Sequence, residues 1–143
     1  MKRLLAALLS SDLKNPVYNF GILFFRIAVA AQLIIVHGLK KIGVGVASAE
    51  VVPNPLGFPP SLNEFIAIAA NTYLPFLVII GFCTRIAALP ALCVTLTGYF
   101  VVHANDPLAV SDVPYMYSIS LLFIVILGGG RYSLDHYISQ KIK

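Results

Sequence analysis

The sequence predicts an all-α membrane protein: a bundle of four transmembrane helices with a structured Pro/Gly-rich outer loop between the first and second helices. Composition is the first observation, because 59% of the 143 residues are hydrophobic and only 11% are charged, against about 25% charged in a soluble domain. The second is that four stretches are long and apolar enough to span a bilayer. The third is that runs such as residues 121–127 do not alternate apolar with polar residues, which excludes a transmembrane β-barrel. The ten Lys and Arg residues are scattered, so we expect no nucleic-acid partner.

The four spans are placed by the distances between charged residues. No charged residue occurs in residues 65–84, 86–105 or 113–130, which are 20, 20 and 18 residues long. Residues 15–39 form another such stretch with one interruption, Arg26. Since roughly 20 apolar residues cross the hydrocarbon core, we expect spans at about 17–39, 62–82, 86–104 and 114–130. We expect residues 1–143 to form a single integral-membrane domain.

Residues 1–14 begin like a signal peptide, with two basic residues followed by an apolar run. That run has six residues, and Asp12 and Lys14 follow it closely, whereas a signal peptide has an apolar core of roughly 7 to 15 residues. We therefore expect a short interfacial helix, with a signal peptide as the alternative.

The Lys and Arg residues outside the spans predict the orientation of the chain. Two of them, Lys40 and Lys41, follow the first span, and seven lie on the side of both termini: Lys2, Arg3, Lys14, Arg85, Arg131, Lys141 and Lys143. Cytoplasmic segments of membrane proteins carry an excess of Lys and Arg. Both termini should therefore be cytoplasmic.

The connections between spans differ in length. The tight turn of residues 81–85 should make the second and third spans antiparallel neighbours. Residues 40–60 contain prolines at positions 53, 55, 59 and 60 and cannot be helical throughout. Because this segment is also rich in apolar residues, we expect a structured cap over the outer mouth of the bundle, with a flexible exposed loop as the alternative.

Arg26 is the most informative single residue, because a cation inside a span costs about 2.5–3.5 kcal/mol and must face the bundle interior with a partner. At about 100° per residue, His37 falls within about 20° of Arg26 around the helix and Lys40 within about 40°. This stripe predicts a polar cavity open to the outer face, suited to an anion or to the carbonyl of a quinone. The alternative is that Arg26 locks helix packing while His37 and Lys40 lie in the interface.

Further polar residues are candidates for the same cavity. Pro75 should free the backbone carbonyl of Asn71, which would then offer Arg26 two oxygens; the alternative is that Asn71 bonds its own helix. Tyr99 in the third span needs an interior acceptor for its hydroxyl. His103 and Asp112 fall at the outer mouth and suit a ligand or proton entry site, or they end helices at the headgroups.

Six segments together resemble the DoxX family of small bacterial four-helix membrane proteins. They are Arg26, His37-Gly38-x-Lys40, Pro53-Asn54-Pro55-Leu56-Gly57, Gly81-x-x-Thr84-Arg85-x-Ala87-Ala88, His103-Ala104-Asn105-Asp106-Pro107 and Gly128-x-Gly130-Arg131-Tyr132-Ser133-Leu134-Asp135. The resemblance covers residues of about 20 to 136. It departs from the family at Asn71, where the family usually has a Glu, and at Asp112, where Glu is more common. The missing carboxylate at Asn71 weakens any proton-coupled chemistry inferred from relatives.

The resemblance implies a protein of the bacterial inner membrane associated with redox or sulfur metabolism, since the family name comes from a thiosulfate:quinone oxidoreductase subunit. We expect an accessory or anchor subunit of a quinone-linked redox system. The alternative is a quinone-binding oxidoreductase subunit that takes electrons from a periplasmic donor, so enzymatic activity stays open. A transporter is less well supported, because no inverted repeat is evident.

The remaining expectations concern cofactors and partners. We expect no metal site, and quinone is the one cofactor that the pattern suits. A haem between His37 and His103 is a weaker alternative, since both look interfacial. Cys83 and Cys93 are too far apart across the predicted hairpin for a disulfide. The partners expected are the lipid bilayer and another membrane or periplasmic subunit, and a homo-oligomer stays open.

Overall fold

The structure is a computed structural model that describes residues 15–142, and the predicted interfacial helix of residues 1–14 lies outside the described residues. The described residues form helices and no β-strand. Four helical segments are long and apolar enough to cross a membrane: Pro16–Lys41, Pro60–Ile80, Thr84–Val102 and Leu108–Leu127. The predicted four-helix membrane fold is therefore confirmed.

Three of the four spans contain a π-helical turn, which lies near the C-terminal end of the first and third spans and in the middle of the second. The first span consists of α2 (Pro16–Leu33), η1 (Ile34–Gly38) and α3 (Leu39–Lys41); the second of α4 (Pro60–Ile68), η2 (Ala69–Tyr73) and α5 (Leu74–Ile80); the third of α6 (Thr84–Thr97) and η3 (Gly98–Val102). The fourth is α7 (Leu108–Leu127), and α8 (Leu134–Ile142) follows it. A π-turn inserts one extra residue into a helix and changes which side chains share a face beyond it.

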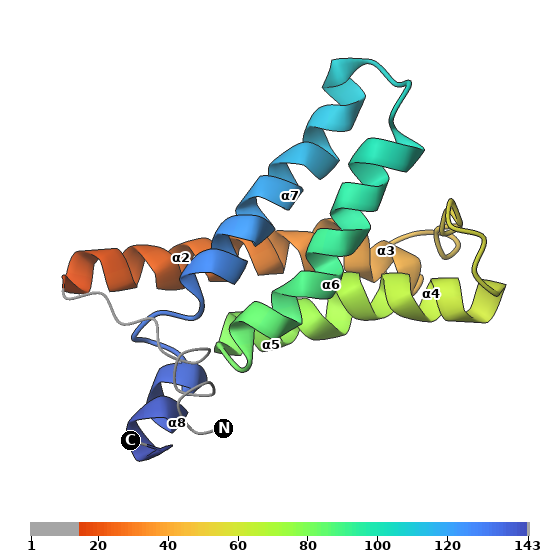
Figure 1. The fold of residues 1–143 in the computed structure, drawn as a ribbon. Helices are drawn as coiled ribbons and strands as arrows, with labels where there is room; N and C mark the ends of the chain where they lie inside the picture. Colours follow the sequence, from red (N-terminus) through yellow and green to blue (C-terminus); the bar gives the residue numbers. More distant parts are fainter. Residues whose placement is uncertain (1–14, 143) are drawn as a thin grey trace.

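The helices form two pairs that meet at one end (Figure 1). The first span lies beside the second, and α6 and α7 form a hairpin that crosses them, with α2 in contact with both α5 and α7. We call the end with residues 42–59 and the connection 103–107 the loop end. The opposite end, with the turn 81–83 and residues 128–142, is the turn end.

The core of the bundle is built from small and medium apolar side chains. Ala87, Ala88 and Ala91 of α6 are 3% exposed or less. Small residues let helix backbones approach closely, which is how helices associate in a membrane where lipid competes for every apolar contact. Larger apolar side chains, such as Phe24, Phe76 and Phe123, are exposed on the outside of the bundle and suit contact with lipid tails.

The fourth helix begins at Leu108, earlier than the predicted start near residue 114. The prediction began after Asp112 because it counted uncharged residues, whereas α7 carries this carboxylate within its second turn. Pro107 precedes the helix, where a proline is tolerated because no backbone donor is lost. The second span ends at Ile80, because Gly81 adopts a left-handed conformation with φ of 74°.

The loop of residues 42–59 is held by its own hydrogen bonds. The side chain of Asn54 both donates to the Phe58 carbonyl (2.6 Å) and accepts from the Phe58 amide (3.0 Å). Asn63, at the start of α4, donates to the Pro53 carbonyl (3.1 Å), and the Glu50 amide donates to the Lys40 carbonyl (3.0 Å). The loop is therefore held by hydrogen bonds to both spans that it connects, which agrees with the expectation of a structured segment.

Candidate functional site

Arg26 is fully enclosed in the bundle, with 1% of its surface exposed. Its Nη1 donates to the carbonyls of Val78 (2.6 Å) and Ile79 (2.8 Å), and its Nη2 donates to the carbonyl of Tyr132 (2.5 Å). The last carbonyls of a helix have no intrahelical donor and carry partial negative charge. The guanidinium therefore neutralises the end of α5 and joins it to the segment after α7.

Asp135 performs the complementary role at the start of α6. Its Oδ1 accepts from the Cys83 amide (2.6 Å), and its Oδ2 accepts from the Thr84 amide (2.8 Å) and the Thr84 hydroxyl (2.7 Å). The residue is 2% exposed. A carboxylate satisfies the free amides at a helix N-terminus and is favoured there by the helix dipole. Asp135 is thus an N-cap for α6 supplied from a distant helix.

Gly81 lies between these two charged residues. A Cβ at this position would come within 2.5 Å of the Ser133 Cβ and 2.6 Å of Arg26 Nη1, so no larger residue fits. The Gly81 carbonyl accepts from the Asp135 amide (2.9 Å). We call Arg26, Gly81, Thr84, Ser133 and Asp135 the turn-end cluster. This cluster locks the turn end of the bundle, because the carboxylate of Asp135 and both terminal nitrogens of Arg26 bond to groups within the protein, although the buried Nε of Arg26 has no hydrogen-bond partner among the described residues.

A different feature, at the loop end, has the properties of a binding site. A cavity of about 370 Å³ lies between the loop, α4 and the α6–η3 segment, within the range of about 300–1,000 Å³ typical of small-molecule sites. Phe58 of the loop, Ala67 of α4 and Cys93 of α6 are among its mostly apolar lining residues. Lys41, Asn63 and His103 supply polar groups. We call it the loop-end cavity.

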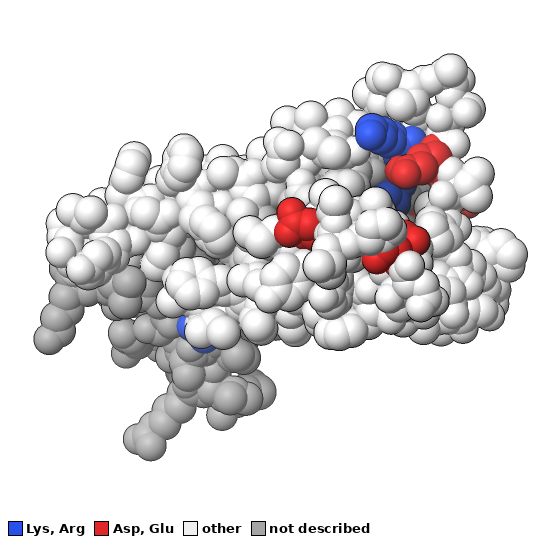
Figure 2. Space-filling view, turned by 90° about the horizontal axis from the view of Figure 1, so that it is seen from above, with Lys and Arg blue, Asp and Glu red and all other residues white. Residues whose placement is uncertain are grey.

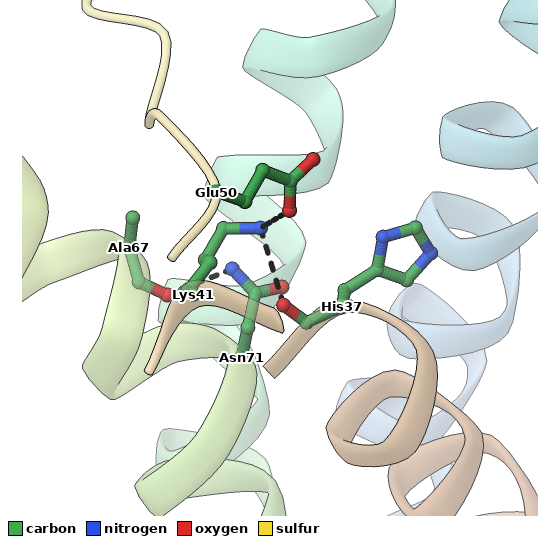
Figure 3. Close-up of polar contacts among 5 residues, drawn as sticks. All are labelled: His37, Lys41, Glu50, Ala67 and Asn71. Atoms are coloured by element: carbon green, nitrogen blue, oxygen red, sulfur yellow. Dashed lines mark hydrogen bonds and ion pairs between the residues drawn. The ribbon is translucent and has the colours of Figure 1, made fainter. Parts of the chain in front are cut away.

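Lys41 is the cation of this cavity. Its ammonium lies 3.6 Å from Glu50 Oε2 and donates to the His37 carbonyl over 3.4 Å, as Figure 3 shows. Its side chain is 12% exposed, whereas that of Glu50 is 51% exposed. Both contacts are long for an ammonium group, because a strong hydrogen bond from a charged nitrogen to an oxygen is about 2.8 Å long. Lys41 therefore retains the capacity to donate to a ligand.

His103 lies on the opposite wall of the cavity, at the end of η3. Its Nδ1 lies 2.7 Å from Asp106 Oδ2, and the imidazole is one-third exposed. The carboxylate orients the ring and leaves Nε2 as the second polar atom. A ligand head in the cavity would thus find an ammonium on one side and an imidazole on the other.

The predicted stripe of Arg26, His37 and Lys40 does not form one wall. Arg26 belongs to the turn-end cluster, and Lys40 is exposed and does not line the loop-end cavity. The reason is the π-turn η1, which adds a residue between Arg26 and the lysines and so brings Lys41 to the position that an uninterrupted α-helix would give Lys40. The His37 ring packs edge-on against Tyr117 at 5.3 Å.

Asn71 bonds its own helix, which was the alternative interpretation. Its Nδ2 donates to the Ala67 carbonyl (2.7 Å), and Figure 3 shows this contact beside Lys41. The carbonyls of α5, and not those of Asn71, accept from Arg26. The Asn71 carbonyl instead lies against Gly38, where a Cβ would come within 2.4 Å of it. The glycine therefore allows η1 and η2 to touch.

The two remaining predicted residues lie apart from the loop-end cavity. The Tyr99 ring is half-buried and packs against Tyr115, with centroids 5.2 Å apart. Asp112 is exposed on α7 and lines a separate groove between α2 and α7. Figure 2 shows that the charged side chains on the face it draws gather mostly toward the loop end. Of the predicted site residues, the cavity lining includes His103 alone.

Sequence reasoning missed Lys41, Asn63 and Cys93 as cavity residues and Asp135 as a cap. Lys41 is next to the predicted residue Lys40. The π-turn that brings Lys41 to the cavity in place of Lys40 has no recognisable pattern in the sequence. Asp135 is the last residue of the motif that begins at Gly128. Ser and Asp side chains often bond to backbone amides at the start of a helix, and this tendency could have identified Asp135 as a cap.

Both cysteines are free thiols in different surroundings. Cys93 is exposed and lines the loop-end cavity. Burial raises the pKa of the Cys83 thiol, and the nearby negative charge of Asp135 raises it further. Within residues 15–142, no group of three His, Cys, Asp or Glu side chains is arranged to hold a metal ion.

Comparisons with known proteins agree with the fold. The family model of DoxX matches residues 21–104, more than half of the chain. An uncharacterised protein of Haemophilus influenzae is 30% identical over 86 residues, and this match covers 57% of the chain and 57% of the relative. The chain thus spans a little over half the length of that relative. No solved structure matches with significance.

Proposed function

This chain belongs to the DoxX family, and we propose that it is an accessory subunit of a quinone-linked redox system that holds a quinone in the loop-end cavity. The observation that carries the proposal is the composition of that cavity: a mostly apolar chamber of about 370 Å³ with a lysine and a histidine in its walls. A quinone combines a flat ring, two carbonyl acceptors and an apolar tail, which is the combination such a chamber suits.

Two polar groups of the cavity can bond to the ring of a quinone or quinol. Lys41 is a donor for a quinone carbonyl on the wall formed by the first span. In the neutral ring of His103, Nδ1–H donates to Asp106, so Nε2 is an acceptor for a quinol hydroxyl beside η3. Phe58 and Pro55 of the loop present flat apolar surfaces that suit a ring between them. In this arrangement Lys41 and His103 orient the ring, and they carry no electrons themselves.

The apolar tail would leave the cavity between α4 and α6. Cys93 of α6 lies on this wall and is exposed, so a tail that leaves beside it would pass from the cavity into lipid. A ligand dissolved in the membrane could therefore enter sideways without crossing the loop. This route favours a membrane-soluble ligand over a solute from the aqueous phase.

The proposed membrane is the bacterial inner membrane, with both termini in the cytoplasm. Arg85, Arg131 and Lys141 lie at the turn end, whereas Glu50 and Glu64 are among the acidic residues at the loop end. This distribution agrees with the excess of basic residues expected on the cytoplasmic side. The loop-end cavity then lies nearer the periplasmic side of the membrane.

The test measures protection of Cys93 by a quinone. Cys83→Ser leaves one thiol, whose alkylation by N-ethylmaleimide is followed in detergent with and without a ubiquinone bearing a short isoprenoid tail. A fully substituted ring is used so that the quinone cannot itself add to the thiol. We expect saturating quinone to slow the alkylation at least fivefold.

Two lysine variants serve as a matched pair in this test. Lys41→Met should abolish the protection, because it removes the donor in the cavity wall. Lys40→Met should retain it, because Lys40 is exposed and lies outside the lining. Equal protection in both variants, or protection by palmitate and not by quinone, would contradict quinone binding at this site.

An oxidoreductase role is the second candidate, favoured by the position of the cavity near the predicted periplasmic side. Such an enzyme would join two thiosulfate ions into tetrathionate and pass the two electrons released to a quinone, which takes up two protons from water to give the quinol. The accessory role predicts no change in quinone absorbance when the purified chain receives thiosulfate, and turnover only after a second polypeptide is added. Turnover by the chain alone would establish the enzyme and refute the accessory role.

A further inference from the structure

A groove runs along the outside of the bundle between α2 and α7. It has two parts of about 560 and 570 Å³, one toward each end, and Phe25 lines both parts. The groove exists because α6 packs along α7, while α2 contacts α7 over a shorter stretch. Apart from its loop-end polar residues, the lining is almost entirely apolar. We call it the α2–α7 groove.

The length of the groove distinguishes between possible occupants. Its lining on α2 extends from Val17 to Gln32, which are 15 residues apart. At 1.5 Å per residue this corresponds to about 22 Å. The hydrocarbon core is about 30 Å thick, so one lipid leaflet contributes about 15 Å. The groove is therefore longer than a single lipid tail and suits a membrane-spanning helix.

Two polar side chains lie in the loop-end part of the groove without a partner. Asp112 of α7 and Gln32 of α2 are both exposed and both line it. Within residues 15–142, neither side chain forms a hydrogen bond or ion pair. Polar groups at membrane depth are costly unless they bond across a helix interface. Their position therefore favours an occupant that carries a cation at the loop end.

Small residues along the groove leave room for a second backbone. Gly21 of α2 has nothing within 4 Å of the position where a Cβ would lie. Ala28 follows it two turns later on the same helix, and Ser120 and Gly128 face the groove from α7 and its end. Small residues at such spacing allow close approach of helices in membranes.

From these observations we propose that the α2–α7 groove docks a transmembrane helix of another protein, one with a Lys or Arg at its loop end. That cation pairs with Asp112, and a neighbouring hydrogen-bonding side chain contacts Gln32. A second copy of this chain fits less well. The basic residues at its loop end, among those described, are Lys40 and Lys41, and both end the span that forms one wall of the groove.

The proposal is tested by photocrosslinking in membranes of the native host. A benzophenone amino acid is placed at Met116, which lines the groove, and in a control variant at Phe76, which is similarly exposed on α5. We expect one discrete adduct from position 116, whose crosslinked peptide maps to a transmembrane helix with a basic residue at its loop end. Asp112→Asn should reduce the adduct at least fivefold, and Asp112→Glu should retain it.

Charge reversal completes the test. Asp112→Lys should abolish the adduct, and changing the basic residue of the captured helix to Asp should restore it in that background. Adducts with lipid alone, an adduct with a second copy of this chain, or equal yields from positions 116 and 76 would each overturn the proposal. Because Cys93 and Lys41 lie on the other side of the bundle, quinone protection is measured independently in every variant.

Discussion

The carboxylate of Asp135 accepts hydrogen bonds from both the amide and the hydroxyl of Thr84, 51 residues earlier in the chain. It also accepts from the Cys83 amide, so one buried side chain satisfies the start of α6. Arg26 performs the matching role at the end of α5. The two charged residues thus fix both sides of the turn between the second and third spans.

Removing the distant cap should destabilise the bundle. Asp135→Ala leaves two amides and a hydroxyl without an acceptor, so we expect the free energy of unfolding to fall by about 2 kcal/mol or more. Asp135→Asn keeps one acceptor oxygen and should lose less. The measurement is unfolding by SDS in detergent micelles, followed by circular dichroism. Asp112→Ala is the control, because Asp112 is exposed, and an equal loss in that variant would refute the cap.

Gly81 should tolerate no side chain. Gly81→Ala forces a left-handed residue, which costs about 1–2 kcal/mol, and drives a methyl group into Ser133 and Arg26, which adds about 1–3 kcal/mol. Gly57→Ala is a matched control, since Gly57 also has a positive φ but nothing lies within 4 Å of its Cβ position. The difference between the two variants in the free energy of unfolding by SDS measures the cost of the contact between the added methyl group and Ser133 and Arg26. Equal losses would show that backbone strain alone matters.

The guanidinium of Arg26 should not be replaceable by an ammonium. Arg26→Lys keeps the charge, but its donors all lie on one nitrogen, whereas Arg26 reaches α5 with Nη1 and Tyr132 with Nη2, so we expect a loss of about 2 kcal/mol or more in the same titration. Samples that remain folded at low temperature should still show quinone protection of Cys93, because Arg26 does not line the loop-end cavity. Wild-type stability in Arg26→Lys would mean that charge alone is required.

The two thiols should differ in their pH dependence. Burial and the negative charge of Asp135 both favour the neutral thiol of Cys83 and raise its pKa. Since the thiolate is the reactive form, the alkylation rate of Cys83 in Cys93→Ser should keep rising above the pH at which a free cysteine levels off. The rate is measured with N-ethylmaleimide between pH 6 and about 10, with free cysteine as the reference. A plateau at or below that of free cysteine would contradict the raised pKa.

Hydropathy was sufficient to predict the four spans, because the bilayer imposes one dominant constraint on composition along the chain. The inward direction of Arg26 followed from the cost of a cation in lipid. Its acceptors could not be predicted, because they are backbone carbonyls, which every residue has, and one belongs to Tyr132 near the end of the chain. The choice between Lys40 and Lys41 depended on η1, since one inserted residue rotates everything beyond it.

Asp112 illustrates a second limit of predicting the site from the sequence. Counting charge-free residues treats every carboxylate as the end of a span, whereas α7 places this one within the helix beside the α2–α7 groove. The residue was predicted to belong to the same chamber as His103, but the two lie on separate faces. Which interhelical gap a residue enters depends on crossing angles, and these arise from packing throughout the bundle.

The order in which the chain is synthesised determines when the contacts of the turn-end cluster can form. Arg26 is synthesised 106 residues before its acceptor Tyr132, and Thr84 is synthesised 51 residues before Asp135, which caps α6. Until the carboxyl-terminal segment emerges, the early hairpins insert with open helix ends and a cation lacking part of its coordination. The turn end of the bundle is therefore locked only after the segment that contains Tyr132 and Asp135 has been synthesised.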